Sequence, residues 1–520
     1  MFADWDPRRL TGGSRASRGF VFSVVSAYVL ITGFVALHHE MWRDEADGWL
    51  FARDGDFLRI VDWSRHAGTP TLWYFLVAPL ARIGLPSQSQ QLLHLVVAAA
   101  AVAGLVALAP FTRVTKILIA TSYFFSYEYS VIVRSYALAV LLAFAVAALW
   151  PSRRERPLAL AFVLFLLFNA NAQGFFIAGT FSVLFAVECF SERTLRGRNA
   201  FAALAMVCGA VVSWMQVRTP PDPARQGAAH VFNGDAFPFL VGSAWFPGAS
   251  NLLLAFAGGL VIMLAVTLAL RHSREAIFLL WFPVAALGLL HSWVWIGGLR
   301  HAGFFMIVAL LAMWIGAVDP AREASSISSQ HSVTRPAETT LNLAAPRSRD
   351  LKRPPGAMTT AAILLNASLL FSTAVAIRYW IADTRASFSG AKEMAGFIRS
   401  HHIDLDPIAA HNLTQCEALL PYLPGRVFWY AGLQQDGTYL NWDAAMERAL
   451  DVPYPVAEAR SREHFRGKRW SLLLNVEMPD PESHGYRLLY ANQIPVFEKR
   501  DERYWLYQPL HLGPITSRIP

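Results

Sequence analysis

Residues 8–47 read RRLTGGSRASRGFVFSVVSAYVLITGFVALHHEMWRDEAD. The apolar run at 19–37 is long enough for a helix that crosses a bilayer, which needs about 20 residues. Four arginines precede this run, and cytoplasmic segments of membrane proteins are enriched in Lys and Arg. The run is therefore predicted to be a retained transmembrane helix with a cytoplasmic N-terminus, and the chain is predicted to emerge on the outer side at His38.

The rest of the chain repeats this pattern of apolar runs and short basic clusters. Of its 520 residues, 54% are hydrophobic and only 16% are charged, whereas about 25% are charged in an average soluble domain. The net charge of +8 is spread over clusters between apolar runs, which argues against a nucleic-acid-binding protein. The three cysteines predict neither a disulfide framework nor a CxxC metal site.

The basic clusters also predict the topology. Clusters at 113–116, 153–156, 193–198 and 271–274, and the segment 319–355, all fall on the cytoplasmic side if the segment 70–85 does not cross. That segment is short and interrupted by Arg82, so we expect a helix in the outer interface. The predicted fold is an α-helical polytopic membrane protein with about 11 transmembrane helices, the last at 358–379, and a C-terminal soluble mixed α/β domain.

Two regions are predicted on this basis. Residues 1–380 form the transmembrane domain, in which 39–90 are the first outer loop and 319–356 are a disordered cytoplasmic linker rich in Ser, Pro and Arg. Residues 383–520 form a periplasmic domain. Its strands are expected at 407–410, 426–430, 470–476 and 486–490, its helices at 389–399, 442–450 and 456–465, and a terminal hairpin between 495–498 and 504–507.

Ionisable and aromatic side chains gather in the predicted outer loops. The first outer loop carries Asp44 and Glu45, the second carries Glu128 and Arg134, and the fifth ends in Arg300 followed by a histidine. Ionisable groups near membrane depth are costly to desolvate, so they usually face a cavity and serve a function. The structural alternatives are solvated loop charges, an ion pair between Glu128 and Arg134, and a plain helix start at position 300.

These residue types suit transfer from a lipid-phosphate donor. A carboxylate at 44 or 45 can take a proton from an incoming hydroxyl. Arginine offers a bidentate fork to phosphate, which suits Arg134 and Arg300. Tyr and Trp rings offer flat apolar faces to a sugar or an isoprenoid chain.

Three motifs carry a resemblance to a known family. They are RDE at 43–45 in the first outer loop, GTPTLWY at 68–74 as a Pro-led aromatic helix start, and YEYSVIVRSY at 127–136 in the second outer loop. The chain resembles the GT-C superfamily of membrane glycosyltransferases, and within it the bacterial relatives of protein O-mannosyltransferases and lipid A aminoarabinose transferases. The resemblance covers roughly the first 300 residues at the level of topology.

The resemblance implies a hexosyl- or pentosyltransferase of the bacterial inner membrane. It would move a sugar from a polyprenyl-phosphate carrier, such as undecaprenyl phosphate, to a lipid, glycan or protein acceptor on the outer face. Asp44 is expected to be the base, with Glu45 in reserve. The expected site residues are the catalytic Asp44, Glu45 and Glu128 and the substrate-binding Arg134, Arg300, His301, His66, Tyr129 and Tyr136. His66 lies slightly before Gly68-Thr69-Pro70, where relatives often carry His-Pro-Pro.

Two points stay open at this stage. Some GT-C members need a divalent metal, and the carboxylates at 44, 45, 47 and 128 could bind one, but their spacing does not require it, so no cofactor is expected with certainty. The alternative function is a transporter or flippase that binds a lipid-phosphate or lipid-linked sugar without chemistry. Such a protein would tolerate loss of the carboxylate better than loss of the arginines.

Overall fold

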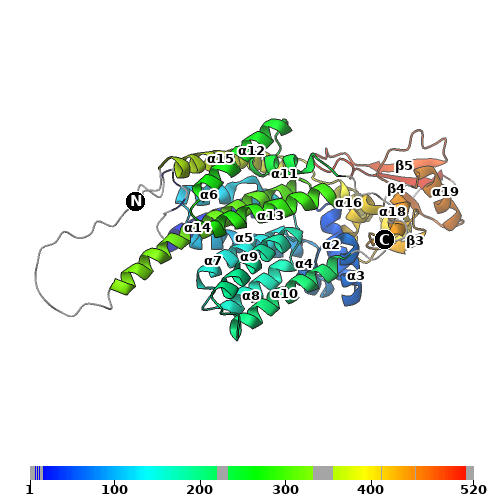
Figure 1. The fold of residues 1–520 in the computed structure, drawn as a ribbon. Coiled ribbons are helices and arrows are strands. Elements are labelled where there is room, and N and C mark those ends of the chain that lie inside the picture. Colours follow the sequence, from blue (N-terminus) through cyan, green and yellow to red (C-terminus); the bar gives the residue numbers. More distant parts are fainter. Residues whose placement is uncertain are drawn as a thin grey trace, which may run out of the picture.

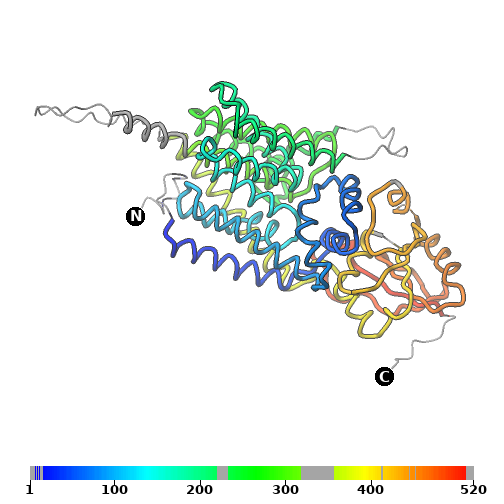
Figure 2. Tube along the Cα trace, turned by 90° about the horizontal axis from the view of Figure 1, so that it is seen from below, coloured from blue at the N-terminus to red at the C-terminus, as the bar shows by residue number. Residues whose placement is uncertain are grey.

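The structure, a computed structural model, describes residues 6, 9, 11, 16–218, 232–331, 355–411, 413–450 and 452–510. Figure 1 shows a bundle of long helices with the strands of the C-terminal region gathered at one end. Figure 2 shows that α1 (Arg18–His38) begins at the opposite end of the bundle and runs toward the C-terminal region. The predicted class, a helical polytopic membrane protein with a C-terminal α/β domain, is confirmed.

Within the described residues, eight helices are long and apolar enough to cross a membrane. They are α1, α5 (Gln88–Leu108), α9 (Ala172–Ser191), α10 (Arg198–Val217), α12 (Leu252–Ala269), α13 (Arg274–Trp293), the Leu299–Ala317 part of α14 (Leu299–His331), and α15 (Pro355–Arg385). The other three expected crossings coincide with shorter helices, α6 (Arg113–Thr121), α7 (Tyr136–Leu149) and α8 (Pro157–Phe168). A helix of 9 to 14 residues is shorter than the roughly 20 needed to span alone.

The segment predicted as the first outer loop folds into three short helices beside the C-terminal region. These are α2 (Arg43–Asp54), α3 (Phe57–Ala67) and α4 (Leu72–Arg82), and α4 packs against α2. At 11 residues α4 is too short to cross a bilayer, in line with the expectation for the segment 70–85. A further short apolar helix, α11 (Ala236–Trp245), packs between α12 and α14.

The apolar part of α14, Leu299–Ala317, lies at the centre of the bundle, because 83% of the residues in its most apolar 18-residue stretch are buried. Gly303 allows α14 to approach the π-helical turn η2 (Phe124–Glu128), since a Cβ there would collide with the Tyr129 hydroxyl and the Phe124 ring. π-helical turns occur often at functional sites. The close approach places the first residues of α14 beside the segment Phe124–Tyr129.

The C-terminal region contains one six-stranded sheet in the order β3-β2-β1-β4-β6-β5. Its strands are β1 (Ile408–Ala410), β2 (Phe428–Tyr430), β3 (Gln435–Gly437), β4 (Ser471–Leu474), β5 (Tyr486–Ala491) and β6 (Trp505–Pro509). Strand β1 is parallel to β2 and β4, and the other pairs are antiparallel. The helices are α16 (Ala391–Ser400), α17 (Leu413–Cys416), α18 (Ala444–Leu450) and α19 (Tyr454–His464).

The structure bears on two predicted features of this half of the chain, the hairpin near the C-terminus and the linker at 319–356. The predicted hairpin between 495–498 and 504–507 is wrong, because β4 and β5 occupy both edges of β6, and Val496 bridges to Ser387 instead. The helix α14 continues to His331 and so overlaps the first part of the predicted linker at 319–356. Residues 332–354 of that linker lie outside the described residues.

Candidate functional site

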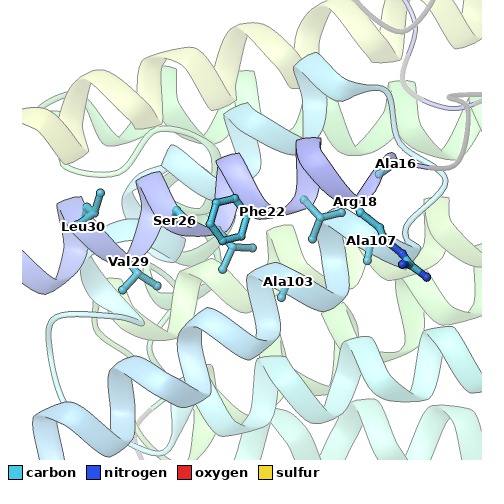
Figure 3. A pocket seen from close by; sticks show the side chains of 10 residues that line it. Ala16, Arg18, Phe22, Ser26, Val29, Leu30, Ala103 and Ala107 are labelled. Carbon is cyan, nitrogen blue, oxygen red and sulfur yellow. The ribbon is translucent and has the colours of Figure 1, made fainter.

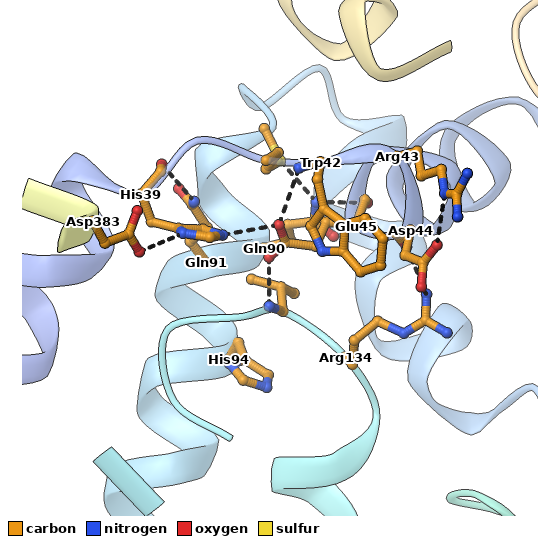
Figure 4. A network of polar contacts seen from close by, with 12 residues as sticks. His39, Trp42, Arg43, Asp44, Glu45, Gln90, Gln91, His94, Arg134 and Asp383 are labelled. Carbon is orange, nitrogen blue, oxygen red and sulfur yellow. Dashed lines mark hydrogen bonds and ion pairs between the residues drawn. The ribbon is translucent and has the colours of Figure 1, made fainter. Parts of the chain in front are cut away.

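Asp44 lies in the first turn of α2 and is surrounded by three arginines. Its Oδ2 is 2.9 Å from an Arg300 guanidinium nitrogen and 3.4 Å from one of Arg134, and its Oδ1 is 3.6 Å from Arg43 Nε. Arg134 also donates to the Asp44 backbone carbonyl at 2.9 Å (Figure 4). The side chains of Asp44, Arg134 and Arg300 each keep about a fifth of their exposure (18%, 22% and 21%), so the cluster remains accessible.

The arginines set the charge of Asp44. Burial works to raise the pKa of this carboxyl, but the positive charges of Arg134, Arg300 and Arg43 outweigh it and hold the pKa at about 2. Asp44 is therefore ionised at neutral pH. The sequence predicted Asp44, Arg134 and Arg300 separately, and the fold brings these three residues together from three distant segments of the chain.

Glu45 faces a different environment. Its side chain is fully buried, Oε1 accepts the Val133 backbone N–H at 2.5 Å, and Oε2 accepts the Trp42 N–H at 3.2 Å. Oε2 also lies 3.1 Å from His39 Nε2, and the other nitrogen of His39 lies 2.7 Å from Asp383 Oδ2. Because both oxygens are engaged, these contacts favour a structural role for Glu45 over the predicted reserve base.

His39 contacts both Glu45 and Asp383, and these contacts join the start of α2 to the end of α15 (Figure 4). Burial lowers the pKa of His39, but the two flanking carboxylates outweigh it and raise the pKa to about 10. His39 is therefore a buried cation between two carboxyl groups. Sequence analysis missed this role, because the His38-His39 pair carries no local pattern that points to Asp383, 344 residues away.

Glu128 ends η2 and lines a separate cavity. Its Oε2 accepts the Tyr123 hydroxyl at 2.6 Å, and Arg134 pairs with Asp44. The structural alternative for these residues, an ion pair between Glu128 and Arg134, is therefore not formed in the described part of the chain. Burial raises the pKa of Glu128. The cavity measures about 200 Å³, and Arg300 also lines it. Arg300 thus borders both Asp44 and the Glu128 cavity.

Three other predicted site residues, His301, Tyr136 and Tyr129, form hydrogen bonds at the start of α14. His301 Nε2 lies 2.7 Å from the Tyr136 hydroxyl, and its Nδ1 accepts the Gly298 N–H at 2.8 Å. The Tyr129 hydroxyl donates to the Arg300 carbonyl at 2.5 Å. His301, Tyr136 and Tyr129 are all buried, so these contacts favour positioning of Arg300 over direct contact with a substrate.

His66 is not brought to this cluster. It lies in the last turn of α3, whereas the charged contacts of Asp44 among the described residues come from Arg43, Arg134 and Arg300. For a metal, the described part of the chain holds no group of three or more His, Cys, Asp or Glu side chains arranged to bind an ion.

Two apolar grooves run along the bundle, apart from Asp44. The larger, about 810 Å³, lies between α1 and α5 and has Arg18 at one end (Figure 3). The smaller, about 310 Å³, lies between α1, α6 and α15. Their apolar linings suit contact with lipid chains, and neither lining includes Asp44, Arg134 or Arg300.

The C-terminal region contacts the start of α2, next to Asp44. Glu502 is buried, and its Oε1 accepts the Arg43 backbone N–H at 3.1 Å, which caps the start of α2. Arg43 also lies 3.7 Å from Asp501. Helix α2, which carries Asp44, is therefore held from the side of the C-terminal sheet.

The buried carboxyl group of Glu502 predicts that the stability of the folded protein depends on pH. Burial raises the pKa of Glu502 from its ordinary value of 4.5 to about 8, so between these values the folded protein holds a proton that the unfolded chain has released. Stability should therefore fall as the pH rises from about 5 to about 8. We expect Glu502→Gln to reduce this fall and to raise the Tm at pH 8, measured by thermal unfolding in detergent. The exposed Glu482→Gln is the control, and an equal effect of both variants would refute the assignment.

No family model matches this chain, and no curated protein matches it. Among solved structures, the crystal structure of ArnT from Cupriavidus metallidurans in the apo state aligns with a TM-score of 0.55 at 14% identity, over 95% of this chain and 99% of that one. The same protein bound to undecaprenyl phosphate aligns with a TM-score of 0.53 at 12% identity, over 95% of this chain and 98% of that one.

ArnT is a lipid A aminoarabinose transferase, a GT-C glycosyltransferase. At these identities the likeness concerns the fold, and it extends beyond the motif-bearing first part of the chain to the C-terminal sheet. The resemblance stated from the sequence is confirmed at this level. The chain shares the fold of ArnT over nearly its whole length.

Proposed function

We propose that this chain is a GT-C-type glycosyltransferase that moves a sugar from a polyprenyl-phosphate-linked donor to a lipid, glycan or protein acceptor. The observation that carries the proposal is the convergence of Arg134 and Arg300 on the ionised Asp44 within an ArnT-like fold. Undecaprenyl phosphate bound to ArnT supports a polyprenyl carrier. The sugar transferred would be a hexose or a pentose.

The same fold suggests an arrangement in the bacterial inner membrane. Residues 1–380 would form the membrane domain with its N-terminus in the cytoplasm, and residues 383–520 would form a periplasmic domain. Asp44 and its arginines lie at the bundle end that adjoins the C-terminal sheet, so the reaction would take place on the outer face. Nucleotide sugars are absent there, which makes a lipid-linked donor necessary.

The two arginines would hold the leaving group. Arg134 and Arg300 present guanidinium groups that match phosphate oxygens, and bonds between ions of opposite charge are about twice as strong as neutral hydrogen bonds. As the bond between the anomeric carbon and the phosphate oxygen breaks, negative charge grows on the phosphate. Cations that are already in position stabilise this charge without reorganising.

Asp44 would act as the base. In the structure its pKa is about 2, which is too low for an efficient base, because the arginines are paired with it. A phosphate that binds the arginines would weaken those pairs and raise the basicity of Asp44 once the donor is in place. The acceptor oxygen then bonds to the anomeric carbon with inversion, the phosphate leaves with the bonding electrons, and Asp44 takes the hydroxyl proton.

The test uses the purified full-length chain in detergent. It is mixed with a panel of radiolabelled polyprenyl-phosphate sugars and candidate acceptors, and free polyprenyl phosphate and carrier binding are both measured. Release of polyprenyl phosphate supports the transferase. Binding of the carrier without release, across all donors and acceptors, would favour the alternative of a transporter or flippase for a lipid-phosphate.

A further inference from the structure

The cavity beside Arg300 is built jointly by the membrane bundle and the C-terminal region. It measures about 200 Å³. Its walls come from the first outer loop, η2, the start of α14, the end of α15 and the segment before β6. The lining residues that matter here are Trp42, Glu128, Arg300, Tyr379, Phe388 and Lys499. A ligand in this cavity would touch both parts of the protein.

Lys499 is the contribution of the C-terminal region to this cavity. Its backbone is fixed, because its N–H donates to the Phe388 carbonyl at 3.0 Å and its carbonyl accepts the Glu502 N–H at 2.9 Å. Its ammonium lies 3.9 Å from the centre of the Trp42 ring. The Arg300 guanidinium lies 5.4 Å from the centre of the same ring. Two cations from distant parts of the chain thus share one indole.

The charges around the cavity leave Lys499 available to an anion. Arg300 is bonded to Asp44, whereas Lys499 forms no ion pair within 4.0 Å among the residues that the structure describes. Glu128 and Glu498 are the carboxylates in the cavity lining, and Glu128 already accepts the Tyr123 hydroxyl. A cation–π contact with Trp42 stabilises the ammonium and leaves its N–H donors free for a ligand.

We propose that Lys499 and Arg300 together bind the phosphate of the lipid carrier, so that the C-terminal region completes the donor site. This inference rests on the proposed function, because it takes the carrier phosphate as the ligand. The aromatic rings of Tyr379 and Phe388 line the same cavity and provide an apolar contact for the first isoprene units. The C-terminal region then serves a purpose that its own sequence does not indicate.

The test compares the binding of two probes, undecaprenyl phosphate and the uncharged undecaprenol, by the full-length chain in detergent. Lys499→Met should weaken binding of undecaprenyl phosphate about tenfold or more, as expected for a lost charged hydrogen bond, and should leave undecaprenol binding unchanged. Lys499→Arg should restore most of the affinity. Arg500→Ala, an exposed cation in the same turn, is the matched control and should bind both probes like the wild type.

Two outcomes would overturn the inference. If Lys499→Met binds undecaprenyl phosphate like the wild type, Lys499 does not contact the phosphate. If it loses both probes equally and unfolds at a lower temperature, Lys499 only fastens the C-terminal region to Trp42. Failure of the proposed function looks different: the wild type would bind undecaprenyl phosphate but release none from any donor, and the effect of Lys499→Met on binding would still be readable.

Discussion

Asp44→Asn is expected to lower the release of polyprenyl phosphate by about 10²–10⁴-fold, the usual contribution of a general base. Asparagine has nearly the same volume and can still accept a hydrogen bond from Arg300, so the local geometry should survive. It cannot take a proton from the acceptor hydroxyl. Single-turnover release from a radiolabelled donor at saturating protein measures the chemical step apart from binding.

The same substitution should leave carrier binding intact or tighten it. In the wild type Asp44 neutralises part of the charge of Arg134 and Arg300, and a phosphate has to compete with it. The uncharged asparagine removes this competition. The matched control is Asp62→Asn, a carboxylate on α3 in the same outer loop, which should turn over like the wild type. If Asp44→Asn kept more than a tenth of the wild-type rate, the base would have to be sought elsewhere, with Glu128 as the next candidate.

The long apolar runs allowed the helical bundle to be predicted, because a helix that faces lipid must be apolar along its length. The same reasoning placed Asp44, Arg134 and Arg300 at the outer helix ends, although the two arginines lie 90 and 256 positions from Asp44 in the sequence. The charge pattern carried enough information to group them on one side. It did not indicate which of these three side chains would contact one another.

What could not be predicted depends on the direction of single side chains and on long-range docking. Asp44 and Glu45 are adjacent in sequence and equally acidic, yet successive residues of a helix point about 100° apart, so one faces the arginines and the other faces His39. Lys499 stood in a turn that looked like the tip of a hairpin. Its position beside Trp42 follows from how the C-terminal region packs against α2, which no local pattern encodes.

Glu45→Ala is expected to destabilise the protein by about 3–5 kcal/mol, because it removes one partner of a buried ion pair. The His39 cation would keep only Asp383, and the Val133 and Trp42 N–H groups would lose their acceptor. Glu45→Gln should cost less, since its carbonyl oxygen can still accept one of these N–H groups. Thermal unfolding in detergent measures both effects, with the exposed Glu482→Ala as the control.

The two adjacent acids can then be separated by normalising activity to folded protein. If Glu45 is structural, the Glu45→Gln protein that remains folded should release polyprenyl phosphate within a few-fold of the wild-type rate. Asp44→Asn should show the opposite result, with a near-normal Tm and a lost chemical step. A Glu45→Gln variant with a normal Tm and a rate reduced a hundredfold would instead make Glu45 a reacting group, and its hydrogen bonds to His39, Trp42 and Val133 would then have to open during the reaction.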